Sequence, residues 1–308
     1  MNIRKFWLSQ VGDYEIKQLK VFATVVNCGG FSAAETELNI TRSTISTHIS
    51  NLESRLNLVL CRRGRGGFSL TEEGKIIYDA ARKLFTDLDG FRSTVNSLNS
   101  TLSGDLRLLF SDTVSGDTRL QLPTLINRLY DQAPDVYINI DVASMSVIEQ
   151  KVINNEAEIG FIPFHREIEG LEYLYLFTDT CLLYCHEKHP LYHVPEDELT
   201  DEMIDAQALV QAGLKPHKDA AQLFETMDLR ATAYYYETRL AIIRSGKYIG
   251  FLPEFYVNNG TCKGELRALK PQQRSYNLDS GAIIHKASRP NKARELFLRL
   301  LKENFNNL

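Results

Sequence analysis

The sequence lacks the features that mark membrane-spanning, exported and disulfide-framework proteins. No uninterrupted apolar run approaches the ~18 residues of a transmembrane helix, and the N-terminus MNIRKFWLSQVGD has no apolar signal core. The five cysteines are an odd number and are widely scattered, which argues against a disulfide framework and suits a reducing compartment. We therefore expect a cytoplasmic protein without a membrane partner.

Motifs for catalysis are also missing. The chain has no GxSxG, no Walker loop, no HExxH and no GxGxxG placed after a strand, so we predict no enzyme activity and no cofactor. One stretch does carry zinc-ligand residue types, at Cys181, Cys185, His186, His189 and His193. However, residues 181–185 read as an extended strand spanning ~13 Å, and both thiolates cannot reach one ion at ~2.3 Å each. The spacing therefore favours strand cysteines and a surface loop over a metal site.

The chain also has little excess of positive charge, and what it has is concentrated at one end. Residues 1–75 hold 10 Lys and Arg against 7 Asp and Glu, net +3, whereas the rest holds 25 against 32, net −7. The length of 308 residues allows two or three domains, and 44% hydrophobic residues are typical of a globular protein. A mildly basic head on an acidic body fits a regulator better than a protein that coats nucleic acid.

The most informative stretch is TRSTISTHISNLE, residues 41–53. Its apolar residues fall on one helical face, at Ile45, Ile49, Leu52 and Leu56. The opposite face carries hydroxyls at Ser43, Thr47, Ser50 and Ser54, where an exposed helix is usually covered with Lys and Glu. Small hydroxylic side chains allow close approach to another surface and can bind base edges and phosphates in a major groove. This pattern indicates a DNA-reading helix.

The flanking residues strengthen this interpretation. Ser32 and Glu35 have the spacing of a capping box for a short helix, and Thr41 is placed to cap the next helix after a tight turn. This arrangement predicts a helix-turn-helix whose second helix enters the groove. A flexible basic loop, residues 62–67, follows and suits a wing on phosphates or a minor groove. We expect DNA contacts from Ser32, Thr41, Arg42, Ser43, Thr44, Ser46, Thr47, His48, Ser50, Arg63 and Arg65.

The stretch GGFSAAETELNITRSTISTHISNLESRLNLVLCRRGRGGFSLTEEG resembles the winged helix-turn-helix of LysR-type transcriptional regulators. The matching features are the aromatic-Ser-Ala-Ala opening, Leu38, Thr41, Ser46, Ile49, Leu52-Glu53, Leu60, Arg63, Leu70-Thr71-Glu72 and Gly74. The stretch departs from the family at Arg42, Thr47 and Cys61, where Gln, Arg and Phe are usual. The resemblance implies a DNA-binding regulator that activates or represses transcription.

Two further helices frame this domain. Residues 14–28 form the first helix, with apolar positions Ile16, Leu19, Ala23 and Val26. After a cap at Thr71, a helix of ~30 residues carries a seven-residue repeat at Ile77, Ala81, Leu84, Leu88, Phe91, Val95, Leu98 and Leu102. We interpret it as a dimerisation helix, since a helix packed only on its own domain would drift at 3.6 residues per turn; such packing is the alternative. A dimer implies two DNA half-sites.

From Asp105 on, strands and helices alternate. The apolar runs LRLLFS, VYINIDVA and AEIGFIPF, separated by helical residues 120–132 and 147–155, indicate a parallel sheet. A second cluster has strands near 174–184, 206–211, 231–237 and 248–252, and helices near 218–227 and 239–245. Strands near 266–269 and 280–285 and a helix at 291–305 are expected to return to the first lobe. This half resembles the family's effector-binding domain, itself like periplasmic solute-binding proteins, with Gly246, Gly250 and Pro253 matching.

The predicted fold is α/β, with an N-terminal winged helix-turn-helix, a long linker helix and a C-terminal two-lobed α/β effector domain resembling periplasmic binding proteins. We assign residues 1–13 to an extension, 14–75 to the DNA-binding domain, 76–103 to the linker helix and 104–308 to the effector domain. Lobe I comprises 104–163 and 267–308, and lobe II comprises 164–266.

Polar residues after the predicted strands mark a candidate effector site, because ligands of open α/β sheets bind beyond the carboxyl ends of the strands. The candidates are Ser111, Asp112, Thr113, Ser115, Ser144, Ser146, Gln211 and Glu237. The alternative is that they are ordinary loop hydroxyls and helix caps. If both carboxylates lie in the cleft, they favour an amine or a hydroxylic ligand over an anion.

Two hypotheses follow. In the first, the chain is a sequence-specific DNA-binding regulator controlled by a small-molecule effector between the lobes. Its partners are double-stranded DNA, the effector, further copies of itself in a dimer or tetramer, and RNA polymerase. In the second, it is a cytoplasmic solute-binding or enzymatic α/β protein whose N-terminal helices serve only assembly.

Overall fold

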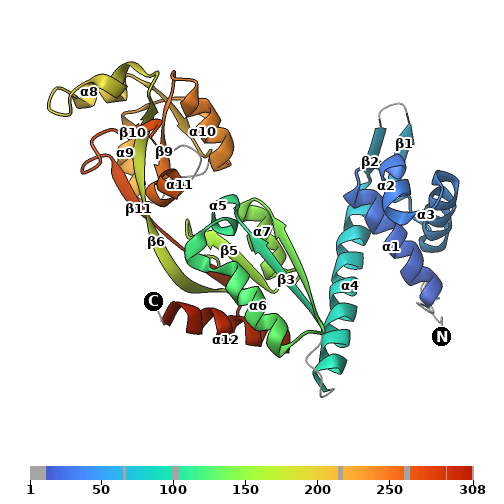
Figure 1. Cartoon of the computed structure of the whole chain (residues 1–308). Helices are drawn as coiled ribbons and strands as arrows, with labels where there is room; N and C mark the ends of the chain where they lie inside the picture. Colours follow the sequence, from blue (N-terminus) through green and yellow to red (C-terminus); the bar gives the residue numbers. More distant parts are fainter. Residues whose placement is uncertain are drawn as a thin grey trace. The chain divides into compact units, whose positions relative to one another are not determined.

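The computed structural model describes residues 12–64, 67–98, 104–213, 218–259, 264–288 and 290–306 (Figure 1). The chain divides into two compact units, Met1–Arg92 and Ser93–Leu308. Residues 1–11 of the predicted extension lie outside the described part of the chain. Each unit is described by itself.

The N-terminal unit contains the predicted helices. They are α1 (Asp13–Asn27), α2 (Phe31–Leu38), α3 (Arg42–Leu56) and α4 (Glu72–Leu98), with strands β1 (Cys61–Gly64) and β2 (Gly67–Leu70) before α4. The core forms where α1, α2 and α3 meet, and its fully buried side chains are Phe22, Val25, Ala34, Ile45, Ile49 and Leu60. Thr41 caps α3 as predicted, because its Oγ1 accepts a hydrogen bond from the N–H of Thr44.

Two local predictions for this unit were wrong. α2 begins at Phe31 with Gly30 as its N-cap at φ 153°, so Ser32 is not the cap. The Glu35 carboxylate instead accepts the N–H of Arg42 at 2.6 Å. The basic segment is an antiparallel hairpin pairing Cys61 with Leu70, rather than a loop. The predicted first helix is confirmed: of its four apolar positions Ala23 is buried, and Ile16, Leu19 and Val26 are half-buried. Its fully buried positions are Gln18, Phe22 and Val25.

Two contacts join α3, the hairpin and α4. The Glu53 carboxylate Oε1 accepts the N–H groups of Leu60 at 2.8 Å and Cys61 at 3.2 Å, so the last turns of α3 hold the start of the hairpin. The N-terminus of α4 passes so close to Leu60 that a Cβ at Gly74 would lie 1.9 Å from the Leu60 carbonyl oxygen. Only glycine fits at this crossing.

The C-terminal unit is built on one sheet with the strand order β4-β3-β5-β11-β6-β9-β7-β8 among its described residues, and β10 pairs with β6. Lobe I contains β3 (Gly104–Phe110), β4 (Val136–Val142), β5 (Ile159–Pro163), α5 (Asp112–Ser115), the 3-10 turn η1 (Thr118–Leu120), α6 (Leu122–Gln132), α7 (Met145–Ile153) and α12 (Lys292–Asn306). Strand β3 pairs in parallel with β4 and β5, as predicted.

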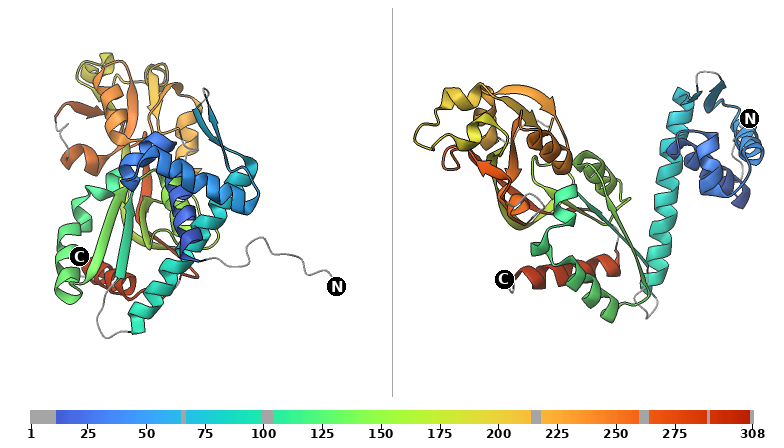
Figure 2. Two further views of the ribbon diagram at one scale, coloured as in Figure 1. Left: turned by 90° about the vertical axis from the view of Figure 1, so that its right-hand side faces the viewer. Right: turned by 45° about the horizontal axis from the view of Figure 1, so that its top comes forward.

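Strand β3 of lobe I is covered on both faces, since its side chains alternate between them, whereas the edge strand β4 is largely exposed. Leu108 and Phe110 of β3 pack in the cluster that contains α6 and α12, whereas Leu109 packs with residues of α7. Helices α6 and α12 lie side by side in both Figure 1 and Figure 2. This double cover buries most of β3 and β5 and leaves their carboxyl ends for a site.

Lobe II contains shorter elements. They are η2 (Pro190–His193), α8 (Asp201–Asp205), β7 (Ala208–Gln211), α9 (Lys218–Glu225), β8 (Asp228–Thr232), α10 (Tyr236–Arg244), β9 (Ile249–Pro253), α11 (Glu254–Asn259) and β10 (Leu266–Ala268). Two long antiparallel strands, β6 (Leu171–His186) and β11 (Ser275–His285), run through both lobes. The predicted crossing strands are thereby confirmed.

Two predictions for lobe II were wrong. The strand expected near 231–237 ends at Thr232, and Glu237 lies on α10. The strand near 266–269 does not return to lobe I, because β10 pairs with β6 from Leu266 opposite His186 to Ala268 opposite Tyr184. That part of β6 also pairs with β9 of lobe II.

Candidate functional site

The hydroxyl face of α3 is exposed as the sequence predicts. Ser43, Thr47, Ser50 and Ser54 are exposed, whereas Ile45 and Ile49 are 0% exposed. The apolar side of α3 is therefore buried in the core of the N-terminal unit. What α3 presents outward is a row of short polar side chains.

The N-terminus of α3 carries a cluster of hydroxyls. Thr41 Oγ1 lies 2.9 Å from Ser43 Oγ and 2.9 Å from Thr44 Oγ1. The exposed side chain of Arg42 adds a positive charge beside them. The N–H groups of Arg42 and Thr44 are already bound by Glu35 and Thr41, so the hydroxyls, the Arg42 side chain and the partial positive charge of the helix end are what suit this cluster to an anion such as a phosphate. Thr47 Oγ1 donates to the Ser43 carbonyl at 3.0 Å and so offers its methyl group and lone pairs outward.

The other predicted DNA contacts have mixed surroundings. Ser32 is exposed in the first turn of α2, and Ser46 is half-buried. His48 is also half-buried, with its ring centroid 6.5 Å from that of Tyr14 and its Nδ1 enclosed. Arg65, and the side chain of Arg63, lie outside the described part of the chain.

The repeat on α4 changes character along the helix. Ile77 and the 2% exposed Ala81 lie in its first half, where Ile77 packs against the core of the N-terminal unit. Leu84 and Leu88 are half-buried, and further along Phe91 is 68% and Val95 42% exposed. The side chain of Leu98 and all of Leu102 lie outside the described residues. The second half of the stripe thus leaves large apolar side chains in solvent.

The C-terminal unit contains a cavity of about 100 Å³ that is partly open to solvent. One edge, called here the polar edge, is formed by Ser111, Asp112, Met145 and Pro163 of lobe I together with His165, which follows β5. Lobe II and the crossing strand β11 contribute a mainly apolar wall, with Val210, Gln211, Ala212, Ala220, Phe224, Tyr234, Tyr236, Arg239, Phe251, Tyr276 and Leu278. The lining combines a few polar groups with aromatic surface, as in sites for small organic molecules.

Three of the predicted effector residues, Ser111, Asp112 and Gln211, line this cavity. The structure gives the others different surroundings: Ser115 Oγ donates to the Asp112 carbonyl, and the hydroxyl oxygens of Ser144 and Ser146 lie 3.3 Å apart. The side chain of Thr113 lies outside the described part of the chain. Glu237 is exposed and lines a second cavity.

Two hydrogen bonds close the cavity across the lobes. Asp112 Oδ2 in lobe I accepts the N–H of Tyr236 at 2.9 Å, at the first residue of α10 in lobe II. In the opposite direction, the Tyr234 hydroxyl of lobe II accepts the N–H of Met145 at 2.7 Å, at the first residue of α7 in lobe I. Burial raises the pKa of Tyr234, so this hydroxyl stays neutral. Each lobe therefore caps a helix N-terminus of the other.

Two lining residues were missed by the sequence analysis. Arg239 is only 5% exposed, and its guanidinium donates to the carbonyl oxygens of Ala233, Tyr234 and Phe251. His165 follows the end of β5, so the rule that drew attention to Ser111 after β3 applies to it as well. For Arg239, no sequence signal shows that it faces a cavity rather than solvent.

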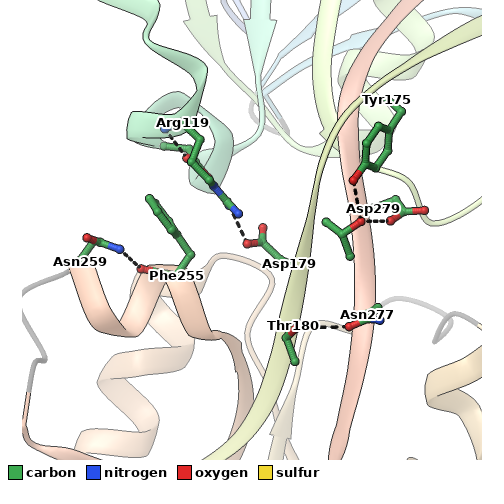
Figure 3. A network of polar contacts seen from close by, with 10 residues as sticks. Arg119, Tyr175, Asp179, Thr180, Phe255, Asn259, Asn277 and Asp279 are labelled. Atoms are coloured by element: carbon green, nitrogen blue, oxygen red, sulfur yellow. Dashed lines mark hydrogen bonds and ion pairs between the residues drawn. The ribbon is translucent and has the colours of Figure 1, made fainter. Parts of the chain in front are cut away.

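A charged network lines the second cavity, whose volume is about 190 Å³. Figure 3 shows the contact of Arg119 with Asp179 in this network. Arg119 Nη2 lies 2.6 Å from Asp117 Oδ2 and 2.6 Å from Asp179 Oδ1, on the crossing strand β6. Its guanidinium is 4.0 Å from the ring centroids of both Phe177 and Phe255. Since Phe255 belongs to α11, Arg119 links lobe I to the crossing strand and to lobe II.

The cysteines Cys181 and Cys185 lie on β6 and are buried, as the strand interpretation requires. Burial raises the pKa of Cys181 to about 12 and of Cys185 to about 11. Within the described ranges, no three His, Cys, Asp or Glu side chains are close enough to hold a metal ion. Nor does any helix in these ranges have the length and apolar character needed to cross a membrane.

Comparisons with known proteins agree with this architecture. A family model described as bacterial regulatory helix-turn-helix protein, lysR family, matches residues 16–75, and a LysR substrate binding domain model matches residues 99–306. The HTH-type transcriptional activator BauR of Pseudomonas aeruginosa is 35% identical over 292 residues, which cover 94% of this chain and 95% of BauR. The nitrogen assimilation regulatory protein nac of Escherichia coli is 25% identical over 77% of this chain and 78% of its own.

Solved structures show the same fold. The crystal structure of full-length CbnR in complex with its target DNA has a TM-score of 0.64 and 16% sequence identity, and the match covers 94% of this chain and 99% of CbnR. The full-length structure of AphB, a virulence activator of Vibrio cholerae, has a TM-score of 0.59 and 17% identity, with coverage of 94% and 98%. Taken with the family models and the 35% identical relative, these matches show that the chain belongs to the LysR family of DNA-binding transcriptional regulators, with an N-terminal helix-turn-helix and a C-terminal effector-binding domain.

Proposed function

We propose that this regulator reads its DNA target with the exposed hydroxyl face of α3. The observation that carries the proposal is that this face holds only short polar side chains around a hydroxyl cluster at the positive end of the helix. Ser43, Thr47 and Ser50 are proposed to contact base edges, and Thr41, Arg42 and Thr44 the adjacent phosphates. Ser32, Ser46 and His48 are proposed to support this contact, and Arg63 and Arg65 to extend it from the hairpin.

The second half of the α4 stripe is proposed to pair with another copy of the chain. Phe91 and Val95 are too exposed to serve the fold of a single chain. Pairing two copies would present two recognition helices to two half-sites. The same proposal includes a dimer or tetramer, contact with RNA polymerase and a cytoplasmic location. It also includes the domain limits 14–75, 76–103 and 104–308.

The cavity lined by Ser111, Asp112 and Gln211 is proposed to hold a small-molecule effector. Both lobes line it, so a ligand contacts both and can stabilise one arrangement of the lobes over another. DNA affinity would change only by as much as the ligand discriminates between these arrangements. Thr113, Ser115, Ser144, Ser146 and Glu237 remain candidate contacts in a different lobe arrangement.

A gel-shift comparison of two double variants tests the division of roles on DNA. Ser43→Ala with Thr47→Ala should relax sequence preference, because it removes contacts to bases. Arg63→Ala with Arg65→Ala should weaken binding to all duplexes alike and reduce the slope of log K against log salt by about 2. Ser54→Ala, at the far end of the same exposed face, is the matched control and should change neither.

The result that contradicts this proposal is also specific. If both double variants lose sequence preference equally, the separation of base and phosphate contacts is wrong. If the wild-type protein ignores every duplex offered at low ionic strength, α3 does not read DNA in the proposed way.

A further inference from the structure

The effector cavity contains a buried hydroxyl without a hydrogen-bond partner. Ser111 is 3% exposed, and its Oγ has no partner within the described part of the chain. Its backbone N–H donates to the Phe161 carbonyl at 2.9 Å, which fixes the residue at the end of β3. A buried polar group without a partner costs free energy, so this hydroxyl is prepared for a group that enters the cavity.

A second buried polar atom without a partner lies on the same side of the cavity. It is Nδ1 of His165, which follows β5, the strand paired in parallel with β3. The other ring nitrogen, Nε2, lies 3.5 Å from Oε1 of Glu149. Glu149 is 2% exposed on α7, and its second carboxylate oxygen is bound by Arg166.

This arrangement selects a tautomer of His165. The Glu149 carboxylate favours a proton on the nearby Nε2, and a neutral imidazole then carries a lone pair on Nδ1. Nδ1 is therefore a buried hydrogen-bond acceptor on a residue that lines the cavity. The polar edge therefore contains two hydrogen-bond acceptors, His165 Nδ1 and the Asp112 carboxylate. A ligand that binds there needs a hydrogen-bond donor.

The opposite wall sets the rest of the ligand. Phe224, Phe251 and Tyr276 present aromatic surface to the cavity. Arg239 is the cation in this wall, but its guanidinium is already directed at three backbone carbonyl oxygens. The wall thus favours an apolar body and gives an anionic head no dedicated partner.

We propose that the effector is a small molecule with a hydroxyl or amino group on an apolar, ring-sized body, and that this group donates to His165 Nδ1 beside Ser111 Oγ. Glu149 is a positioning residue that holds the tautomer of His165. The inference rests on the proposed role of the cavity as the effector site and adds the class of ligand to it.

Calorimetry on the full-length protein tests the ligand class with four probes that share one ring. These are benzyl alcohol, benzylamine, benzoate and toluene. We expect the alcohol or the amine to bind at least roughly tenfold more tightly than benzoate and toluene. Ser111→Ala and His165→Leu should each weaken binding of that donor probe by roughly three- to tenfold, which is the effect of one hydrogen bond. Toluene binding should not change.

A double-mutant cycle separates positioning from a merely structural role of Glu149. Glu149→Gln should weaken binding of the donor probe in the wild-type background. It should have little effect beside His165→Asn, because asparagine offers an acceptor near the Nδ1 position without help from Glu149. Ser245→Ala and His193→Leu, two residues outside the lining, are controls and should bind like wild type. Gel shift on DNA checks that each variant is folded.

Several results would overturn the proposed ligand class. They are tighter binding of benzoate than of the alcohol and the amine, no binding of any probe, or equal binding by wild type, Ser111→Ala and His165→Leu. If benzoate binds best and also changes the gel shift, the cavity is an effector site and only the ligand class is wrong. If a donor probe binds as expected but never alters DNA binding, the ligand class holds and the proposed control of DNA binding fails.

Discussion

Replacing Phe91 by alanine should weaken self-association of the protein without unfolding it. Phe91 is 68% exposed in the single chain, so its removal takes away little of the packing that stabilises either unit. In a pair of copies joined through α4, this side chain would become buried. Its loss should then appear in the dissociation constant of the dimer rather than in the melting temperature of the chain.

The size of the effect follows from the exposed fraction. Burying a whole Phe side chain is worth ~1.5–3 kcal/mol, and about two-thirds of that remains to be gained, or roughly 1–2 kcal/mol per copy. A symmetric pair contains two such side chains, so the loss is roughly 2–4 kcal/mol. Since 1.4 kcal/mol corresponds to a tenfold change, the dissociation constant should rise about 30- to 700-fold.

Sedimentation equilibrium over a range of concentrations measures this constant. The matched control is Arg92→Ala, because Arg92 is also exposed on α4 but points about 100° away from Phe91 around the helix. Unchanged association of Phe91→Ala, or an equal loss in Arg92→Ala, would refute the assignment of this stripe to pairing. DNA binding should fall in parallel, because a single recognition helix holds only one half-site.

Three further predictions concern packing and chemistry. Gly74→Ala should lower the free energy of unfolding by about 1–3 kcal/mol in denaturant titration, because the added Cβ meets the Leu60 carbonyl; Gly116→Ala, where a Cβ meets nothing within 4 Å, should not. Tyr234→Phe should lower the free energy of unfolding by roughly 1–3 kcal/mol, because it leaves the Met145 N–H without an acceptor. Tyr235→Phe, at an exposed neighbouring residue, is the control and should have no effect. Maleimide at pH 8 should modify Cys28 in the native protein but neither Cys181 nor Cys185. Both of the latter are buried, and their pKa values of about 12 and 11 keep the thiols protonated. Rapid labelling of Cys181 or Cys185, located by mass spectrometry, would contradict this.

The recognition helix could be predicted because its signals are local. The spacing of Ile45, Ile49 and Leu52 defines one face within four turns, and Thr41 caps the helix with its own side chain. The cap of α2 was mispredicted because Ser32 has the right spacing, whereas the start is decided by the backbone conformation of Gly30. Family membership decides between the two functional hypotheses in favour of the DNA-binding regulator.

In the C-terminal unit the errors have a non-local origin. The tyrosines at 234–236 favour a strand, but the Asp112 carboxylate from lobe I accepts the first N–H of α10 and helps a helix to begin there. β10 pairs with residues 184–186 of β6, beyond Leu182 where the pairing of β6 with β11 ends, and spacing along the chain does not reveal this. His165 could have been found by the strand-end rule, because it follows β5, but a sequence does not show that its Nδ1 is buried without a partner.

The two contacts of Leu60 join α3, the hairpin and the start of α4 into one rigid DNA-binding unit. Glu53 on α3 accepts the Leu60 N–H at the start of the hairpin, and Gly74 of α4 packs closely against the Leu60 carbonyl. Bending the hairpin away from α3 would therefore break the anchor before it altered the fit to a groove. If two copies pair through α4 as proposed, an effector signal carried by α4 would change the distance or tilt between whole DNA-binding units. Inserting a few base pairs between half-sites should then disturb regulation more than any change at the hairpin tip.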